Sequence, residues 1–314
     1  MKDLDINFPL DKFEKLIIDI GWESLDDWFN FWNNKRNILS IDQYWNNKVN
    51  DDWIWGLALP LLSQAYKLQN NFSDRKIIGI SALPGTGKTT LGKWLEAISL
   101  KLNFKIAVIS IDDFYLPSNE MKLAIKNNPW NVSRGFPGSH SVKLMHEKLL
   151  NWKINGELNV PVFDKSLRNG LGDRSHWRLD NPDLLILEGW FLGIKPYSVD
   201  INDRSINTTD LSLHESSYVL KIQKNLKEYL DIWSLIDNIW HLKPLKIEYM
   251  NIWKTNQEKE MFLQKGNALK DEKLSNFLRM LNVSIPHKSF DAIKSYALLL
   301  IDQERNLVEA GLNL

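Results

Sequence analysis

A glycine-rich segment, Ala82-Leu83-Pro84-Gly85-Thr86-Gly87-Lys88-Thr89, constrains the fold more than any other feature of this 314-residue chain. It follows the β-branched apolar run at 77–80 and opens a helical pattern that extends to about residue 102. A strand, a glycine-rich turn and a helix in this order are the context of a phosphate-binding loop, in which backbone N–H groups hold phosphate oxygens. Ala82 replaces the usual first glycine, and a small side chain fits there. We therefore expect a nucleotide-binding α/β fold.

The side chains of this segment suggest how a nucleotide would be held. Lys88 can reach the β- and γ-phosphates, and the Thr89 hydroxyl can bind Mg²⁺. We therefore expect a bound nucleotide and Mg²⁺, although the loop does not say which reaction follows. The residues expected to contact the nucleotide are Leu83, Pro84, Gly85, Thr86, Gly87, Lys88, Thr89 and Thr90.

Further apolar runs predict strands at 105–111, 184–187 and 237–242. Strands that alternate with helices favour a parallel sheet with helices on both faces, so the predicted class is α/β with a phosphate-binding loop. The long glycine-containing stretch between the second and third strands is interpreted as ligand-binding loops or as disorder. Interleaved Lys and Glu at 251–280 predict one charged helix with a solvated face.

The first 72 residues are rich in tryptophan, and we expect them to form a helical extension packed on a core of residues 73–314 that carries the phosphate-binding loop. Apolar residues recur at helical spacing over 13–20 and 25–32. We interpret the aromatic residues as core, with an aromatic ligand cage as the alternative. The tryptophans concerned are Trp22, Trp28, Trp32, Trp45, Trp53 and Trp55.

Composition excludes several classes of protein. The chain has no cysteine, which excludes disulfides, thiolate catalysis and iron–sulfur clusters. Its 39 basic residues balance 39 acidic ones, so no basic surface for nucleic acid is indicated. Apolar runs stay shorter than the roughly 18 residues of a membrane helix, and the first residues lack the apolar segment of a targeting peptide. We expect a cytoplasmic protein that binds neither nucleic acid nor membrane, and the oligomeric state is not predicted.

Carboxylates follow two of the predicted strands directly. Asp112 and Asp113 come after the second strand, and Glu188 ends the third. Ligands of open parallel sheets bind beyond the carboxyl ends of the strands, so these groups should face the γ-phosphate or its acceptor. Asp112 is the candidate general base, with Asp113 in support, and Glu188 is the candidate Mg²⁺ carboxylate. The alternatives are helix-capping aspartates and a solvated glutamate.

Polar residues between these strands could hold the phosphoryl acceptor. Arg134 can bind a carboxylate or phosphate with two parallel hydrogen bonds, and His140 can donate to a hydroxyl. Asp164 could bind a hydroxyl, while Lys165 or Arg174 could neutralise phosphate charge. The alternatives are an ordinary loop and surface salt bridges.

Taken together, these motifs resemble the D-glycerate 3-kinase family, whose P-loop kinase fold is shared with uridine kinases, phosphoribulokinases and type I pantothenate kinases. The resemblance covers about residues 76–196 and is weaker over 243–285, where Trp253 precedes Gln257-Glu258. The chain end after Pro286 departs from the family pattern. The motifs are residues 82–90, Asp112-Asp113-Phe114-Tyr115-Leu116, Arg134-Gly135 with Gly138-Ser139-His140, Pro161 with Asp164-Lys165-Ser166, Gly172-Asp173-Arg174, and Glu188-Gly189-Trp190 with Gly193.

The resemblance implies ATP-dependent phosphorylation of D-glycerate to 3-phospho-D-glycerate, a step of photorespiratory glycolate recycling, by direct Mg²⁺-dependent transfer. On matching positions it implies catalytic roles for Lys88, Asp112, Arg174 and Glu188. Thr89, Asp112 and Glu188 become the candidate metal ligands. The residues implied for the acceptor are Asp113, Tyr115, Arg134, His140, Asp164 and Lys165.

Two other functions stay open at this point. A uridine- or pantothenate-type kinase would keep the mechanism, and Phe114, Tyr115 and Phe136 could form a stacking slot for a nucleoside. A non-catalytic protein that binds ATP and regulates a partner is the second alternative. It predicts missing carboxylates, whereas Asp112 and Glu188 are both present.

Overall fold

The fold is taken from a computed structural model that describes residues 6–39, 44–45, 49–69, 74–168, 170–197, 211–265, 268–269 and 271–313. The start of the chain and the predicted boundary at 72 and 73 lie outside the described residues. Six strands form one sheet in the order β2-β5-β1-β6-β7-β8, parallel except for β8 at one edge. The strands are β1 (Ile77–Ala82), β2 (Ile106–Ser110), β5 (Leu184–Gly189), β6 (Asn238–Pro244), β7 (Ala297–Ile301) and β8 (Leu307–Leu312).

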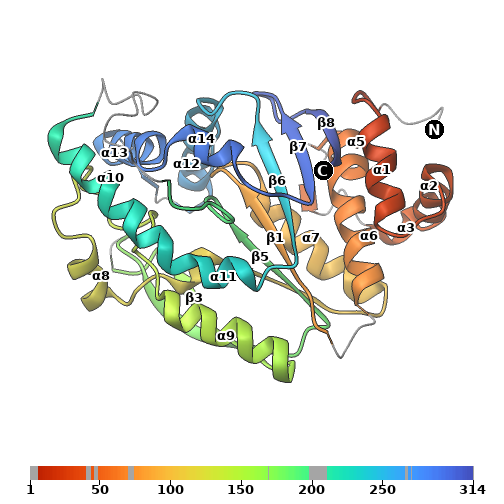
Figure 1. Cartoon of the computed structure of the whole chain (residues 1–314), viewed down its shortest axis with the longest axis horizontal. Coiled ribbons are helices and arrows are strands. Elements are labelled where there is room, and N and C mark those ends of the chain that lie inside the picture. Colours follow the sequence, from red (N-terminus) through yellow and green to blue (C-terminus); the bar gives the residue numbers. More distant parts are fainter. Residues whose placement is uncertain are drawn as a thin grey trace.

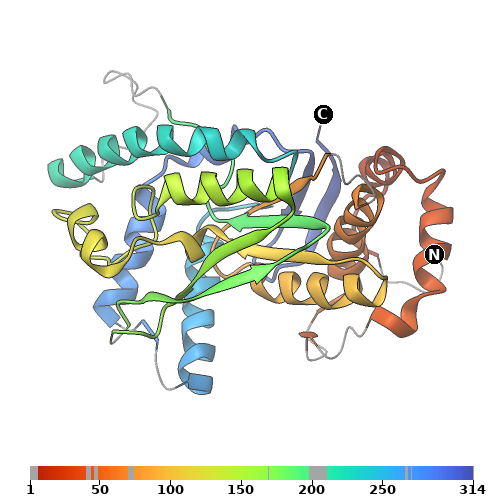
Figure 2. The same ribbon diagram turned by 90° about the horizontal axis from the view of Figure 1, so that it is seen from below.

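Helices cover both faces of this sheet, as the sequence predicts (Figures 1 and 2). Successive side chains of a strand point to opposite faces, and in β1 Ile78 and Ile80 join one core while Ile77 joins the other. The first core contains α6 (Leu59–Leu68) and α7 (Lys88–Lys101). The second contains α9 (Val142–Asn155), α10 (Leu213–Leu226), η4 (Lys227–Tyr229) and α11 (Leu230–Ser234).

The N-terminal helices pack beside β8 and share the first core with the sheet (Figure 1). Trp28 and Trp32 are fully buried, and both indole N–H groups donate to the Ser63 hydroxyl, at 2.7 and 2.8 Å. Trp53 and Trp55 are buried as well, as the core interpretation predicts. The elements are α1 (Asp11–Asp19), α2 (Leu25–Asn33), α3 (Arg36–Leu39), α5 (Asp51–Trp53) and the π-helix η1 (Ile54–Ala58).

The stretch between β2 and β5 is not the run of loops that its glycines predict. It contains the helices η2 (Ile111–Phe114), α8 (Ser118–Ala124) and α9, and a separate hairpin of β3 (Leu158–Asp164) and β4 (Asp173–Asp180). The prediction was wrong because glycines mark the ends of elements here. Gly156 ends α9 with a φ of +79°, a left-handed conformation that glycine adopts without strain.

The charged segment 251–280 is two helices, so the prediction of one solvated helix was wrong. These are α12 (Tyr249–Lys265) and α13 (Asp271–Val283), followed by α14 (His287–Asp291). Trp253 of α12 and Met280 of α13 are buried, which gives each helix a core-facing side.

The strands β7 and β8 were not predicted from the sequence, because a short apolar run is compatible with either a helix or a strand. No described helix combines the length and the apolarity that crossing a bilayer requires.

Candidate active site

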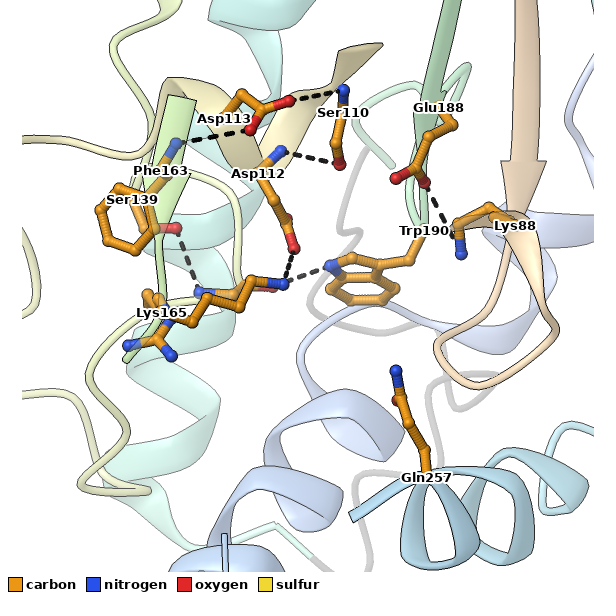
Figure 3. A network of polar contacts seen from close by, with 12 residues as sticks. Lys88, Ser110, Asp112, Asp113, Ser139, Phe163, Lys165, Glu188, Trp190 and Gln257 are labelled. Carbon is orange, nitrogen blue, oxygen red and sulfur yellow. Dashed lines mark hydrogen bonds and ion pairs between the residues drawn. The ribbon is translucent and has the colours of Figure 1, made fainter. Parts of the chain in front are cut away.

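A cleft of about 2110 Å³ opens at the carboxyl ends of β1, β2 and β5. Pockets for a single small ligand measure roughly 300–1,000 Å³, so this cleft has room for a nucleotide and a second substrate. The phosphate loop, the acidic strand ends and helix α12 line it. Figure 3 shows Asp112 with Lys165 on one side of this space and Lys88 with Glu188 on the other.

The phosphate loop has the shape that its sequence predicts. Gly85 and Gly87 have φ values of +82° and +98°, in the region that favours glycine. A Cβ atom on Gly85 would lie 2.7 Å from the Cβ atom of Trp253, so α12 also excludes a side chain there. Lys88 Nζ donates to the carbonyl oxygens of Ala82 at 2.6 Å and Leu83 at 3.1 Å. These bonds hold the ammonium group inside the loop, where a phosphate oxygen can replace the carbonyls.

The other residues expected at the nucleotide divide into two groups. The Leu83 side chain is buried in the second core, so this residue can contribute only its backbone. Pro84, Thr86, Thr89 and Thr90 line the cleft. Thr89 is exposed at the start of α7, which leaves its hydroxyl accessible to a metal ion.

The adjacent aspartates at the end of β2 have different surroundings. Asp113 Oδ2 accepts the Ser110 N–H at 3.0 Å, and Oδ1 accepts the Phe163 N–H at 3.4 Å, so this carboxylate ties η2 to β3. Burial raises the pKa of Asp113 to about 6. Both oxygens are therefore occupied by the backbone, while the neighbouring Asp112 carboxylate turns into the cleft (Figure 3).

Asp112 faces two groups, one on each carboxylate oxygen. Lys165 Nζ lies 2.7 Å from Oδ2, and His140 Nε2 lies 3.9 Å from Oδ1. Burial by itself would raise the pKa of Asp112, but Lys165 and His140 hold it well below its usual range. Lys165 is 57% exposed, so it can move away from Asp112 into the cleft at little cost.

Glu188 and Thr89 fit a magnesium site of the kind found in proteins that bind Mg²⁺ together with a nucleoside triphosphate. Mg²⁺ is usually held by one or two carboxylates together with substrate phosphates and water. Glu188 lies 3.9 Å from Lys88 Nζ beside the phosphate loop, and burial raises its pKa. Across the part of the chain that is described, no three His, Asp or Glu side chains gather into a metal cluster. One carboxylate and one hydroxyl beside the phosphate loop match a site in which phosphates and water supply the other ligands.

His140 lies behind Asp112 and is closed off from the cleft. Its side chain has no exposed surface. Its Nδ1 atom is 2.8 Å from the Tyr229 hydroxyl, which also accepts the Gly138 N–H at 3.1 Å. The structure thus brings His140 to the site, but not into the position of a group that touches the acceptor.

Arg134 and Asp164 line the cleft with local partners. Arg134 Nη1 donates to the carbonyl oxygens of Gly170 at 3.0 Å and Leu171 at 2.7 Å, which holds this loop at the mouth of the cleft. Asp164 Oδ1 accepts the backbone N–H and the hydroxyl of Ser166. Both residues therefore form the part of the cleft wall that lies beside the β3–β4 hairpin.

Arg174 is not brought into the cleft. Its Nη2 donates to the Ser141 hydroxyl at 2.7 Å, and its Nε donates to the Tyr115 carbonyl oxygen at 3.2 Å. These bonds attach β4 to the segment that carries Tyr115. The Tyr115 ring, 3% exposed, stacks on His140 with ring centroids 4.5 Å apart. Of the two positively charged residues predicted to act here, Lys165 directly after β3 contacts Asp112, whereas Arg174 in β4 does not.

Helix α12 supplies a second wall that the sequence motifs did not assign. Lys254 lies in an ion pair with the buried Glu258, whose other oxygen accepts the Leu269 N–H. Gln257 points into the cleft from the same helix (Figure 3). The spacing of these residues after Trp253 places them on one side of a helix, and that spacing was the available signal.

The chain was compared with known proteins. No protein-family model matches it. It is 32% identical over 215 residues to "Uncharacterized kinase mug58" of Schizosaccharomyces pombe, covering 64% of this chain and 76% of that protein. It is 33% identical over 217 residues to "D-glycerate 3-kinase, chloroplastic" of Arabidopsis thaliana, covering 64% of this chain but only 45% of the plant protein.

A solved structure shares the fold. It is the D-glycerate 3-kinase from Cryptococcus neoformans, with a TM-score of 0.68 and 23% sequence identity. The match covers 81% of this chain and 99% of the other. At this identity the likeness concerns the arrangement of strands and helices.

Proposed function

Because the chain belongs to the P-loop kinase family that includes the fission yeast kinase and the plant D-glycerate 3-kinase, we propose that it transfers the γ-phosphoryl group of ATP to D-glycerate. The observation that carries this proposal is the meeting of Lys88, Asp112 and Glu188 in one cleft, with Lys165 beside Asp112. The product would be 3-phospho-D-glycerate, as in glycolate recycling.

The phosphate loop would bind the ATP phosphates. Its backbone N–H groups and the N-terminus of α7 favour negative charge, and Lys88 would exchange the carbonyls of Ala82 and Leu83 for phosphate oxygens. Thr89 and Glu188 would hold Mg²⁺ together with phosphate oxygens. When bound, the ion supplies positive charge that neutralises the phosphates during transfer.

Asp112 would act as the general base toward the acceptor. The acceptor hydroxyl gives its proton to Asp112, and its oxygen forms a bond to the γ-phosphorus. The bond from that phosphorus to the oxygen of the leaving ADP breaks, and ADP keeps the electron pair. Because Lys165 keeps the pKa of Asp112 low, the base becomes effective once Lys165 moves from Asp112 to the anionic acceptor or phosphoryl group.

The acceptor side of the cleft suits a small anion better than a nucleoside. Lys165 and Arg134 supply positive charge at its wall. The aromatic slot considered from the sequence is not open, since Phe114 and Phe136 are buried in the second core and Tyr115 is stacked on His140. A polar site of this kind also rejects analogues that leave its buried groups unpaired.

The test is ADP release from ATP and Mg²⁺ by the full chain against D-glycerate, L-glycerate, uridine, cytidine, pantothenate and no acceptor. The product is identified by mass and NMR, and the Asp112→Asn variant controls for contaminating kinases. Release that depends on D-glycerate and yields the 3-phosphate supports the proposal. ADP release with only a nucleoside or pantothenate would refute D-glycerate as the acceptor. No ADP release above the control without acceptor, for any compound, would refute phosphoryl transfer itself.

A further inference from the structure

A buried chain of hydrogen-bonding groups approaches Asp112 from the side away from the cleft. It starts at the Gly138 N–H, passes through the Tyr229 hydroxyl and reaches His140, whose Nε2 atom lies 3.9 Å from Asp112 Oδ1. Tyr229 is fully buried at the end of η4, and the His140 side chain has no exposed surface. Neither residue lines the cleft, so neither is placed to touch ATP or the acceptor.

The partners of Tyr229 decide which ring nitrogen of His140 carries the proton. The tyrosine oxygen accepts the Gly138 N–H, so its own hydrogen is free to point at Nδ1, 2.8 Å away. If Nδ1 donated instead, the buried tyrosine hydrogen would lose its acceptor, which costs about 1–3 kcal/mol. Nδ1 is therefore the acceptor, and the proton of the neutral ring is on Nε2.

This Nε2–H group has no hydrogen-bond partner among the described residues, although it is buried. Its neighbour at 3.9 Å is Asp112 Oδ1, an oxygen of the carboxylate that the proposed transfer uses as its base. The gap of 3.9 Å to Oδ1 is about 1 Å longer than an ordinary N–H···O bond. A shift of Asp112 by about 1 Å would close the bond, and in this structure Lys165 is bound to the other oxygen at 2.7 Å.

Aromatic rings fix the orientation of the imidazole. The Tyr115 ring stacks on His140 with an interplanar angle of 22°. Phe191 and Tyr229 close the remaining sides, with ring centroids at 5.7 and 5.8 Å. The direction of the Nε2–H bond is thus set by packing before any substrate binds.

We propose that Tyr229 and His140 are positioning residues for Asp112. The Tyr229 hydroxyl keeps the proton on His140 Nε2, and Nε2–H binds Asp112 Oδ1 when Lys165 leaves, so that Oδ2 is presented to the acceptor hydroxyl. This inference rests on the proposed function. It replaces the direct contact between His140 and the acceptor that the family resemblance implies with an action through Asp112.

The first test measures which ring nitrogen of His140 carries the proton, and it needs no substrate. Imidazole ¹⁵N NMR of the full chain, with the His140 signals assigned by their loss in His140→Gln, should show a protonated Nε2 and an unprotonated Nδ1. In Tyr229→Phe the Nδ1 resonance should shift, because its hydrogen bond is lost. A protonated Nδ1 in the wild-type protein overturns the proposal, whether or not any acceptor is phosphorylated.

The second test is kinetic and uses two amides at one position. The amide nitrogen of a glutamine can occupy the place of His140 Nε2, whereas that of an asparagine corresponds to Nδ1 and falls short of Asp112. We expect His140→Asn to lower kcat by roughly tenfold to a hundredfold, the scale of a misplaced catalytic group. His140→Gln should recover most of that loss, and the KM for ATP should stay unchanged in both variants. Equal losses in the two variants, or a loss confined to the KM for ATP, overturn the proposal.

Tyr229→Phe keeps the packing of the ring and removes the hydroxyl. Tyr218→Phe is the matched control, because Tyr218 is also buried and its hydroxyl donates to the Ala124 carbonyl oxygen, remote from Asp112. We expect kcat to fall several-fold in Tyr229→Phe at unchanged KM for ATP, and to stay at the wild-type value in Tyr218→Phe. Similar turnover in the two variants would overturn the role of Tyr229. A wild-type protein that phosphorylates no acceptor would refute the proposed function, and the tautomer would still be decided by NMR.

Discussion

Two adjacent aspartates should respond to the same substitution in opposite ways. Asp112→Asn removes the proposed base, while Asp113→Asn removes one acceptor from a carboxylate that binds two backbone N–H groups. Since the two positions are neighbours in the chain, each variant serves as the control for the other. We expect Asp112→Asn to lose turnover and Asp113→Asn to keep most of it.

The size of the Asp112→Asn effect follows from its surroundings. Loss of a general base lowers turnover by about 10²–10⁴-fold, which is about 3–5 kcal/mol of transition-state stabilisation. Stability at pH 7 should fall modestly, because the low pKa of Asp112 stabilises the fold above that pKa, whereas Lys165 is 57% exposed and its charge returns to water. ATP affinity should be nearly unchanged, since Lys88 contacts the loop carbonyls and Glu188 rather than Asp112.

Asp113→Asn should behave differently because an asparagine offers one oxygen where the aspartate offers two. Either the Ser110 or the Phe163 N–H then loses its acceptor, and such a loss costs about 1–3 kcal/mol. The substitution also removes a buried charge, whose pKa burial raises to about 6. Because that charge destabilises the fold at pH 7, its removal offsets the lost hydrogen bond, and the urea midpoint at pH 7 should change little. Turnover of the folded protein should fall less than in Asp112→Asn.

The assay is acceptor-dependent ADP release at saturating ATP, with ATP affinity measured by calorimetry and stability by urea unfolding. Near-wild-type turnover in Asp112→Asn would refute the assignment of the base. If Asp113→Asn instead lost turnover by 10²-fold at unchanged stability, the roles of the two aspartates would be reversed.

Three further substitutions test other parts of the structure. Lys88→Met should weaken ATP binding by about 10- to 150-fold, since a hydrogen bond to a charged group contributes about 1.5–3 kcal/mol; calorimetry showing wild-type affinity would contradict the phosphate-loop role. Arg134→Lys should raise the KM for the acceptor more than that for ATP, because Arg134 holds the loop at the acceptor side; an effect on ATP alone would contradict it. Arg279, with the Ser212 and Trp130 N–H groups, lowers the pKa of Glu215 from 4.5 to about 2. This depressed pKa stabilises the fold fully above about pH 4.5, by at most about 3 kcal/mol, and the contribution disappears as the pH falls toward 2. Urea unfolding of Glu215→Gln should therefore show lower stability at pH 7 and a smaller loss between pH 4.5 and 2 than the wild-type protein, and equal pH dependence would refute this.

Local signals explain why much of the fold could be predicted. The phosphate loop, the buried strands and the carboxylates at strand ends are short segments. Their conformation depends mainly on residues that are adjacent in the sequence. Glycines at 85 and 87 permit the turn, and the strand β1 before them is apolar on both faces. The same reasoning failed for β3, β4, β7 and β8, because short apolar or mixed segments gain their strand form from a partner strand far along the chain.

The roles of individual site residues depended on which partners they meet. Asp112 and Asp113 are identical side chains in one motif, yet one faces the cleft and the other binds the backbone of Ser110 and Phe163. Arg174 and Lys165 are both cations of the β3–β4 hairpin, yet only Lys165 reaches Asp112. No spacing rule distinguishes such pairs, since the partners come from other elements.

Local sequence accounts for the phosphate-binding loop on a parallel sheet, because that loop needs only glycine conformations, a lysine and the start of a helix in order along the chain. Long-range packing sets how the region around Asp112 is built. Tyr229 lies 89 residues from His140 and gains its place behind Asp112 only when η4 packs against the segment before α9. Hydrogen-bond direction and burial are properties of such long-range contacts, and they decide which polar groups face the cleft and which hold the others in place.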